Sequence, residues 1–313
     1  MTWFSNMMSF LSRAEHTTGS VLSMNQRNLL YIYPHNPREH FDLSDDKIKA
    51  KAVLAASGVP VPESYKVYGS FFELRNLEAD LSAFPSFVVK PAHGRGGGGI
   101  LVIDGKDGDA WTTPGGRRHT LDDMRSHLSD IVFGIHSFGL ADHAIIEERV
   151  IQHPEMQRIS PLGLADVRLI LFKGKPVLAM SRIPTQRSDG KANLHQGAVG
   201  AGIDLNDGRI TRAILGGHPV DQHPDTGEQL VGFTVPFWRH VMEVGLRTAR
   251  AVPLGYIGAD IVITPQGPMV LEINVRPGLQ IQNANGTGMR AILEGLGGMH
   301  TEWDEGRYTE GAD

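Results

Sequence analysis

Short apolar and β-branched runs, separated by polar and glycine-rich segments, recur along the chain and predict a mixed α+β (α/β) protein. Strands are expected at these runs, which cover residues 29–33, 87–90, 100–103, 144–146, 167–172, 177–183, 257–263 and 269–274. The last four runs form two pairs joined by short turn-like segments. We therefore expect one hairpin over 167–183 and another over 257–274.

Apolar spacing and capping residues predict three helices after residue 40. Ser44 is the expected N-cap of the first, which runs for about a dozen residues, and the others cover 121–132 and 236–251. The polar, glycine-punctuated stretch 186–202 predicts a mobile loop. The acidic tail from Thr301 predicts a frayed end.

The first eleven residues are apolar but interrupted, and Trp3, Met7 and Phe10 recur at helical spacing. This pattern predicts a short amphipathic helix. Its polar face lacks a Lys/Arg cluster, so docking on this protein's own core or a partner's is favoured over a membrane surface. No basic residue precedes Arg13, which argues against a secretory signal, and no run reaches the ~18 apolar residues of a membrane span.

Length and charge narrow the function classes. The chain has 313 residues, enough for two packed units, and 30 basic against 35 acidic residues give a net charge of -5. That balance argues against nucleic acid as the main partner. The absence of cysteine excludes disulfides, thiolate nucleophiles and Cys-ligated zinc, and it fits a reducing compartment. We therefore predict a cytoplasmic protein.

A glycine run between two predicted strands, Gly94 to Gly99 with Arg95 inside it, is a candidate phosphate loop. It satisfies G-x-G-x-x-G, but it leads into a strand rather than a helix, which argues against a dinucleotide fold. Backbone without side chains allows N–H groups to approach phosphate oxygens, and Lys90 on the incoming strand supplies positive charge. A flexible hairpin loop with a solvated lysine is an equally weighted alternative.

The second predicted hairpin places oxygen ligands together. Glu272 and Asn274 are two residues apart, so on a strand they share one face. A five-residue connection would set Asp260 opposite Glu272. Two carboxylates and an amide suit Mg²⁺ that also binds substrate phosphates. Arg276 follows, within reach of an anion near the metal; the alternative is the polar face of an exposed sheet.

Other polar residues are individually ambiguous. Arg168 and Arg182 lie on the two strands of the first hairpin, where an exposed sheet could carry them equally well. Lys191, Asn193 and His195 belong to the polar loop. We find no His-Glu-x-x-His zinc motif and no Gly-x-Ser-x-Gly nucleophile elbow.

Six short motifs in order resemble those of the ATP-grasp superfamily. They are Asp46-Lys47 with the helix ending at 57–62, Val88-Val89-Lys90-Pro91 with the glycine run, Ile145 to Val150 with Glu155, Asp166-Val167-Arg168, Asn193 to Gly197, and Asp260 with Glu272 to Asn274 and Pro277-Gly278. The set is most similar to carboxylate–amine ligases, in particular the glutamate ligase that extends a ribosomal protein and the α-L-glutamate ligase-related proteins.

The resemblance implies an ATP-grasp fold, with two α+β subdomains that sandwich ATP. These would cover 46–148, with the glycine loop, and 149–300, with the metal site; 301–313 would be a flexible tail. Typical members have a full α/β domain before the first lysine, so residues 1–45 would be a truncated version of it. A homodimer or a partner protein could then complete the acceptor site.

The resemblance also implies a reaction and its residues. ATP, with one or two Mg²⁺ or possible Mn²⁺ ions, would activate a carboxylate as an acylphosphate that an amine then attacks, with amino acids such as glutamate, or peptides, as substrates. The implied groups are these: catalytic Lys90, Arg168 and Arg276; ATP-binding Lys47, Lys90, Gly96, Gly97, Gly98, Glu147, Glu148, Val150 and Glu155; substrate-binding Arg168, Arg182, Lys191, Asn193 and His195; metal-binding Asp260, Glu272 and Asn274.

Two other functions stay open at this point. The chain could be an ATP-binding regulatory or scaffold subunit without ligase activity, which the short N-terminal region favours and the complete metal set opposes. It could also be a phosphotransferase of the same fold, because both reactions need the same ATP-binding residues.

Overall fold

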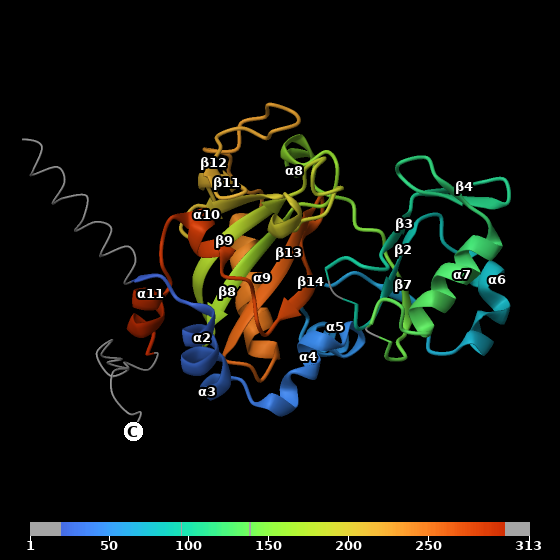
Figure 1. Ribbon diagram of the computed structural model, residues 1–313, viewed down its shortest axis with the longest axis horizontal. Helices are drawn as coiled ribbons and strands as arrows, with labels where there is room; N and C mark the ends of the chain where they lie inside the picture. The colour runs from blue at the N-terminus through green and yellow to red at the C-terminus, as the bar shows by residue number, and fades with distance from the viewer. Residues whose placement is uncertain (1–19, 95, 138, 298–313) are drawn as a thin grey trace, which may run out of the picture.

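Two main antiparallel sheets, on either side of a cavity, organise the protein in a computed structural model that describes residues 20–94, 96–137 and 139–297. The smaller sheet has four strands in the order β1-β7-β2-β3, and the larger has seven in the order β12-β11-β10-β9-β8-β13-β14. Figure 1 shows the small sheet at one end of the molecule and the large sheet at the other. The α+β class expected from the sequence is confirmed.

The helices of the small-sheet unit pack on one face of its sheet. Its unit comprises β1 (Ser64–Tyr68), η3 (Phe71–Asn76), α6 (Leu77–Ser82), β2 (Phe87–Pro91), β3 (Leu101–Ile103), β4 (Gly105–Asp107), β5 (Ala110–Thr112), β6 (Arg118–His119), α7 (Leu121–Val132) and β7 (Ala144–Glu147). Phe87 and Val89 of β2 pack in the apolar cluster with α6 and α7. The alternate residues Val88 and Lys90 line the cavity. Strand periodicity thus places Lys90 at the site.

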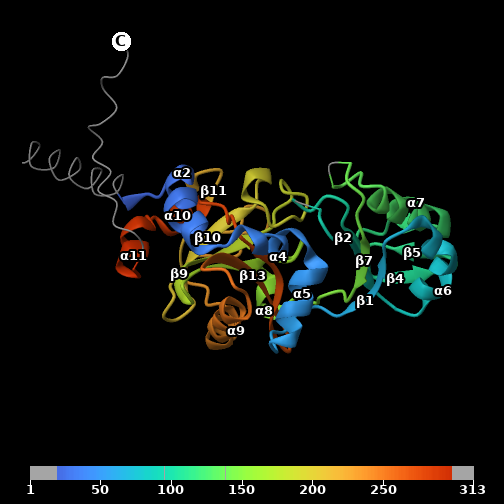
Figure 2. The same ribbon diagram turned by 90° about the horizontal axis from the view of Figure 1, so that it is seen from below.

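The large sheet is covered on both faces. It is built from β8 (Asp166–Phe172), β9 (Lys175–Ile183), β10 (Val199–Ile203), β11 (Ile210–Leu215), β12 (His218–Pro219), β13 (Tyr256–Thr264) and β14 (Gly267–Asn274), with α8 (Pro154–Ile159) and η4 (Leu194–Gln196) in its connections. Helix α9 (Trp238–Ala251) covers one face, and α10 (Gln280–Asn285) lies on the other (Figure 2). Both hairpins predicted from the sequence are confirmed.

The N-terminal segments pack on the large sheet. They are α2 (Met24–Gln26), the π-helical η1 (Arg27–Ile32), α3 (Tyr33–His35), η2 (Arg38–His40), α4 (Asp42–Asp45) and α5 (Lys47–Ala56). Ala50 and Leu54 of α5 belong to the same apolar cluster as α9. The division of the chain at 46–148 and 149–300 remains a proposal, and the packing of α5 would move its first boundary.

Two local predictions near the N-terminus are wrong. Residues 29–33 are helical rather than a strand. The prediction failed because Leu30, Tyr31 and Ile32 are consecutive and all buried, and so short an apolar run shows no helical periodicity. Ser44 is not the N-cap of α5. Asp46 accepts hydrogen bonds from the backbone N–H groups of the helix start, whereas the Ser44 hydroxyl accepts one from the backbone of Val275.

The loop predicted at 186–202 is only partly a loop. Its last residues enter β10, where a Cβ at Gly202 would lie 2.6 Å from the carbonyl oxygen of Ala284 on α10. Glycine here permits close helix–sheet packing rather than mobility. Helices α10 and α11 (Arg290–Gly295) have no counterpart in the sequence prediction. The predicted N-terminal amphipathic helix and the tail from 301 lie outside the described residues.

Across the described ranges, no helix combines the length and apolar character needed to cross a bilayer.

Candidate nucleotide and acceptor site

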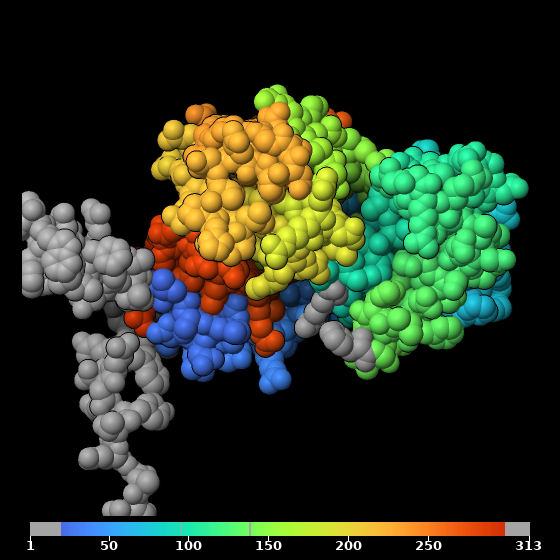
Figure 3. All heavy atoms as spheres, turned by 45° about the horizontal axis from the view of Figure 1, so that its top comes forward, coloured from blue at the N-terminus to red at the C-terminus, as the bar shows by residue number. Residues whose placement is uncertain are grey.

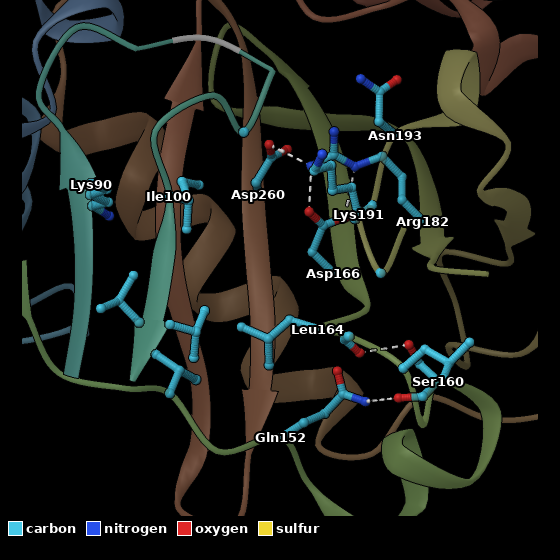
Figure 4. A pocket seen from close by; sticks show the side chains of 18 of the residues that line it. Lys90, Ile100, Gln152, Ser160, Leu164, Asp166, Arg182, Lys191, Asn193 and Asp260 are labelled. Carbon is cyan, nitrogen blue, oxygen red and sulfur yellow. Dashed lines mark hydrogen bonds and ion pairs between the residues drawn. The ribbon is translucent and has the colours of Figure 1, made fainter. Parts of the chain in front are cut away.

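A cavity of about 1270 Å³ separates the two sheets. Lys90 and Ile100 mark its small-sheet wall, and Asp166, Arg182 and Asp260 mark the opposite wall (Figure 4). The space-filling view shows the hollow between the loop after β9 and the small-sheet unit (Figure 3). Its volume exceeds the usual upper range for a single small-molecule pocket, about 1000 Å³, so the cavity has room for more than one small molecule.

The glycine run forms one end of this cavity. Gly96 and Gly97 have φ angles of +65° and +80°, a backbone region that residues with a side chain rarely adopt. Lys47, the first residue of α5, donates a 2.7 Å hydrogen bond from Nζ to the carbonyl of Gly94. Burial lowers the pKa of Lys47. The run is therefore held to the helix by a partly buried cation that also lines the cavity.

Lys90 is paired rather than solvated. Its Nζ lies 2.6 Å from Glu147 Oε1, and the other carboxylate oxygen of Glu147 accepts a hydrogen bond from Lys51 on α5. All three side chains are at least nine-tenths buried. Glu147 is thus occupied by two lysines and is not among the cavity-lining residues, so its predicted contact with adenine stays a prediction.

The remaining nucleotide residues divide in two groups. Val150 lines the cavity, as do the apolar side chains of Val88 and Val102 on the small sheet. Glu148 instead accepts a hydrogen bond from the backbone of Glu63, and Glu155 pairs with Arg158 on the surface of α8. Neither acid lines the cavity, so their roles in binding ATP stay predictions.

Four charged side chains form a network across β9, β8 and β13. Arg168 donates to both oxygens of Asp260, at 2.7 Å from Nε and 2.6 Å from Nη2. Arg182 donates to both oxygens of Asp166 and, at 2.7 Å, to Asp260. The alternation of β8 explains the placement: Ile170 and Phe172 pack under the N-terminal segments, and the same face becomes charged at the cavity.

The charges in this network shift the pKa values of Asp260 and of the neighbouring Glu272. Burial acts to raise the pKa of Asp260, but Arg168 and Arg182 hold it well below its ordinary range. Glu272 lies beside it on β14, and burial together with the negative charge of Asp260 raises the pKa of Glu272. Each arginine therefore has a carboxylate partner inside the protein, which limits its availability to a substrate carboxylate.

The expected opposition of Asp260 and Glu272 is confirmed. The structure reaches it by a two-residue turn and a β-bulge at Leu271, instead of the predicted five-residue connection. Asn274 donates to Asp260 at 3.1 Å, so its carbonyl oxygen stays available. Within the described residues, no group of three or more acidic or histidine side chains could hold a metal.

The structure brings only some of the predicted substrate-binding residues to the cavity. Lys191 and Asn193 line the cavity, whereas His195 does not. Arg276 also lies away from the cavity, with its guanidinium 5.3 Å from the ring centre of Phe41. Its predicted role near the metal stays a prediction.

Sequence reasoning missed several site residues. Lys51 follows Lys47 by one helical turn, a spacing that places both on one face of α5. Asp166 occurs in a predicted motif, yet its pairing with Arg182 depends on the hairpin register. Arg149 also lines the cavity, and the only sequence feature that could have indicated this is its position next to Val150.

The cavity between the two antiparallel sheets is lined by the glycine run and by Lys47 and Lys90. These are the features that the resemblance to ATP-grasp proteins predicts. The sequence matches the model of the sugar-transfer associated ATP-grasp family over residues 26–297. The chain therefore belongs to this family, and its α+β fold is the ATP-grasp fold.

Curated relatives are named probable α-L-glutamate ligases. The protein from Xanthomonas euvesicatoria pv. vesicatoria is 24% identical over 257 residues, 82% of this chain and 65% of that protein. The one from Xylella fastidiosa is 25% identical over 265 residues, 84% and 66% respectively. The chain thus spans slightly less than two thirds of these relatives. The resemblance to α-L-glutamate ligase-related proteins is confirmed.

Similar solved structures include ligases of low identity. D-alanine–D-alanine ligase from Bacillus anthracis complexed with ATP is 17% identical, with a TM-score of 0.45, over 82% of this chain and 61% of that one. The ATP-grasp ligase PsnB, complexed with minimal precursor, Mg and ADP, is 15% identical, with a TM-score of 0.45, over 84% and 60%.

Proposed function

We propose that this protein is an ATP-dependent ligase that forms an amide bond between a carboxylate and an amine and releases ADP and phosphate. The observation that carries the proposal is a single cavity with the glycine run and Lys90 on one wall and Arg168 and Arg182 on the other. The first suits a polyphosphate. The second lies where an activated carboxylate and an anionic intermediate would form.

The nucleotide would lie against the small sheet. Val88, Val102 and Val150 would contact the base, and Lys47, Lys90 and the glycine run would bind the phosphates. Phosphoryl transfer depends mainly on positioning and on neutralising spread negative charge. These cations and backbone N–H groups are suited to that task. Exclusion of water by the glycine run would protect the acylphosphate from hydrolysis.

The oxygen ligands on β13 and β14 are too few to hold Mg²⁺ alone, so phosphate oxygens of the nucleotide would have to complete its coordination. Asp260 already accepts hydrogen bonds from Arg168, Arg182 and Asn274. Glu272 and the Asn274 carbonyl are the better ligands, and Mg²⁺ commonly uses one or two carboxylates plus phosphate oxygens. One or two ions bound there would reduce the negative charge of the phosphates; Mn²⁺ could replace them.

The chemistry would proceed in two steps. A carboxylate oxygen attacks the γ-phosphorus, and the bond from that phosphorus to ADP breaks. The amine then attacks the acyl carbon, phosphate leaves, and the nitrogen loses a proton. Arg168 binds Asp260 through Nε and Nη2, so its remaining nitrogen, Nη1, is left for the charged intermediate.

The relatives' names support an amino acid such as glutamate as the amine, and the carboxylate would be an amino acid or a peptide. Lys191 and Asn193 lie on the cavity wall where the acceptor would bind. A second copy of the chain or a partner protein would complete that side of the site.

The test is ADP and phosphate release with Mg²⁺-ATP against a panel of amino acids and short acidic peptides, with mass spectrometry of the products. A product one water lighter than the summed substrates supports the ligase. A phosphorylated acceptor without an amide indicates a phosphotransferase. ATP binding without turnover indicates a regulatory subunit.

Two variants test the residues. Lys90→Ala and Glu272→Ala should each abolish amine-dependent ADP release while the protein stays folded. Lys49→Met is the control, because Lys49 is an exposed lysine on α5 that pairs with Asp42. Turnover retained in either site variant contradicts the assignment.

A further inference from the structure

Lys51 is a buried cation that the proposed reaction does not use directly. Its side chain is 7% exposed, and Nζ donates to the Pro62 carbonyl at 3.0 Å, to Ser64 Oγ at 3.3 Å and to Glu147 Oε2. An ammonium group has three N–H donors, so every donor of Lys51 has an acceptor. Lys51 is therefore fixed in place and turned away from any ligand.

Lys90 shares Glu147 with Lys51 but is only partly satisfied. Its Nζ forms an ion pair with Glu147 Oε1 at 2.6 Å, and we find no other partner for this Nζ in the described parts of the chain. Lys90 lines the cavity, whereas Lys51 does not. Two of the three Lys90 donors thus remain for a ligand in the cavity.

The charges of the three side chains decide what a ligand experiences. Two lysines and one glutamate leave a net charge of about +1 in a buried cluster, where charges are poorly screened. Without Lys51, the Lys90–Glu147 pair would be neutral. The remaining carboxylate would then attract the Lys90 ammonium and repel phosphate oxygens.

We propose that Lys51 is a positioning residue for ATP: by holding and neutralising Glu147, it leaves the charge and two N–H donors of Lys90 available to the phosphates. The proposal rests on the proposed function, since it assumes that Lys90 binds ATP phosphates. It assigns Glu147 to the two lysines instead of to the adenine amine.

A purely structural role for Lys51 makes a different prediction. If the residue only stabilised α5 against β1 and β7, its loss would lower stability and affect every ligand of the cavity alike. The electrostatic role predicts a loss that grows with the number of phosphates and is reversed when the charge of Glu147 is also removed.

The experiment measures dissociation constants for ATP, ADP and adenosine by isothermal titration calorimetry. Lys51→Met should weaken ATP about tenfold, a loss typical of a weakened charge-assisted contact, weaken ADP less and leave adenosine unchanged. The double variant Lys51→Met with Glu147→Gln restores the charge of about +1 and should regain most of the ATP affinity. Lys49→Met, on the exposed face of the same helix, should match the wild type in all three.

Each outcome decides the question. Equal losses for ATP and adenosine, or no recovery in the double variant, overturn the proposal. If Lys51→Met does not fold, as judged by thermal denaturation, the double variant alone is decisive, because poor ATP binding there overturns it too. Wild-type protein that binds ATP without forming an amide overturns the ligase reaction but not the role of Lys51; wild-type protein that does not bind ATP overturns both.

Discussion

Arg168 and Asp260, on the adjacent strands β8 and β13, are joined by two parallel hydrogen bonds of 2.7 and 2.6 Å. Asp260 is 1% exposed, and Arg182 donates to the same carboxylate. A bidentate pair of this kind fixes the guanidinium plane as well as its position. The acid thus orients two arginines at the cavity wall.

This relationship predicts a large effect of Asp260→Asn on stability. The change takes the carboxylate partner away from the buried guanidinium of Arg168, whereas Arg182 keeps Asp166. Removing one partner of a buried ion pair typically costs about 3–5 kcal/mol. Urea denaturation should show that loss in the free energy of unfolding. Asp122→Asn breaks an exposed ion pair with Arg125 and should cost about 0–1 kcal/mol. Similar losses in the two variants would show that the network adds no stability.

A second prediction concerns acid stability and the base of the glycine run. Asp142 is buried and accepts hydrogen bonds from Ser137 Oγ, His93 Nδ1 at 2.7 Å and backbone N–H groups. Burial acts to raise the pKa of Asp142, but these hydrogen bonds lower it overall. Because the folded pKa is depressed, its contribution to stability is present above the unfolded pKa of about 3.9 and is lost as pH falls through the folded value.

Asp142→Asn should therefore lower the free energy of unfolding near neutral pH. Below about pH 4, the free energy of unfolding of the variant should fall less steeply with pH than that of the wild type. Urea midpoints measured from neutral to acid pH provide the check. Asp107→Asn, which removes an exposed partner of Arg118, should leave the slope unchanged. An unaltered acid slope in Asp142→Asn would contradict the assignment of that slope to this carboxyl.

The third prediction tests the close approach of β10 and α10. A Cβ at Gly202 would lie 2.6 Å from the Ala284 carbonyl oxygen and 2.8 Å from the Cα of Asn285, both backbone atoms that cannot move alone. Gly202→Ala should cost about 1–3 kcal/mol in thermal or urea unfolding. Gly295→Ala, where a Cβ meets nothing within 4 Å, should change stability by less than about 0.5 kcal/mol.

Local patterns predict elements whose residues have one clear period. The helix over 121–132 and both hairpins have such patterns and occur as expected. The segment 29–33 does not, because its buried residues are consecutive and a helix packed on several sides resembles a short strand. The glycines that made 186–202 resemble a loop are required instead by the contact between β10 and α10.

The site shows the same division between local and non-local information. Periodicity on β2 suffices to place Lys90 at the cavity, and hairpin pairing suffices to oppose Asp260 and Glu272. The partners that neutralise the arginines are set by the order of β9, β8 and β13 in the sheet, which joins residues 92 positions apart. The periodicity of a sequence does not reveal the order of strands in a sheet, so these partners could not be predicted from it.

The fourth prediction separates helix stability from nucleotide binding. Asp46 caps α5, accepting from the backbone N–H groups of Ile48 and Lys49, and α5 carries both Lys47 and Lys51. Asp46→Ala should cost about 1 kcal/mol of stability. It should also weaken ATP binding severalfold, because fraying of the first turn displaces Lys47 from the Gly94 carbonyl.

Thr120→Ala is the matched control for that change. Thr120 caps α7 through a capping box with Asp123, so its loss should cost a similar free energy of unfolding. Helix α7 packs on the outer face of the small sheet and carries none of the lysines at the cavity. ATP affinity should therefore fall in Asp46→Ala alone. An equal fall in both variants would mean that overall stability, and not the position of Lys47, sets the affinity.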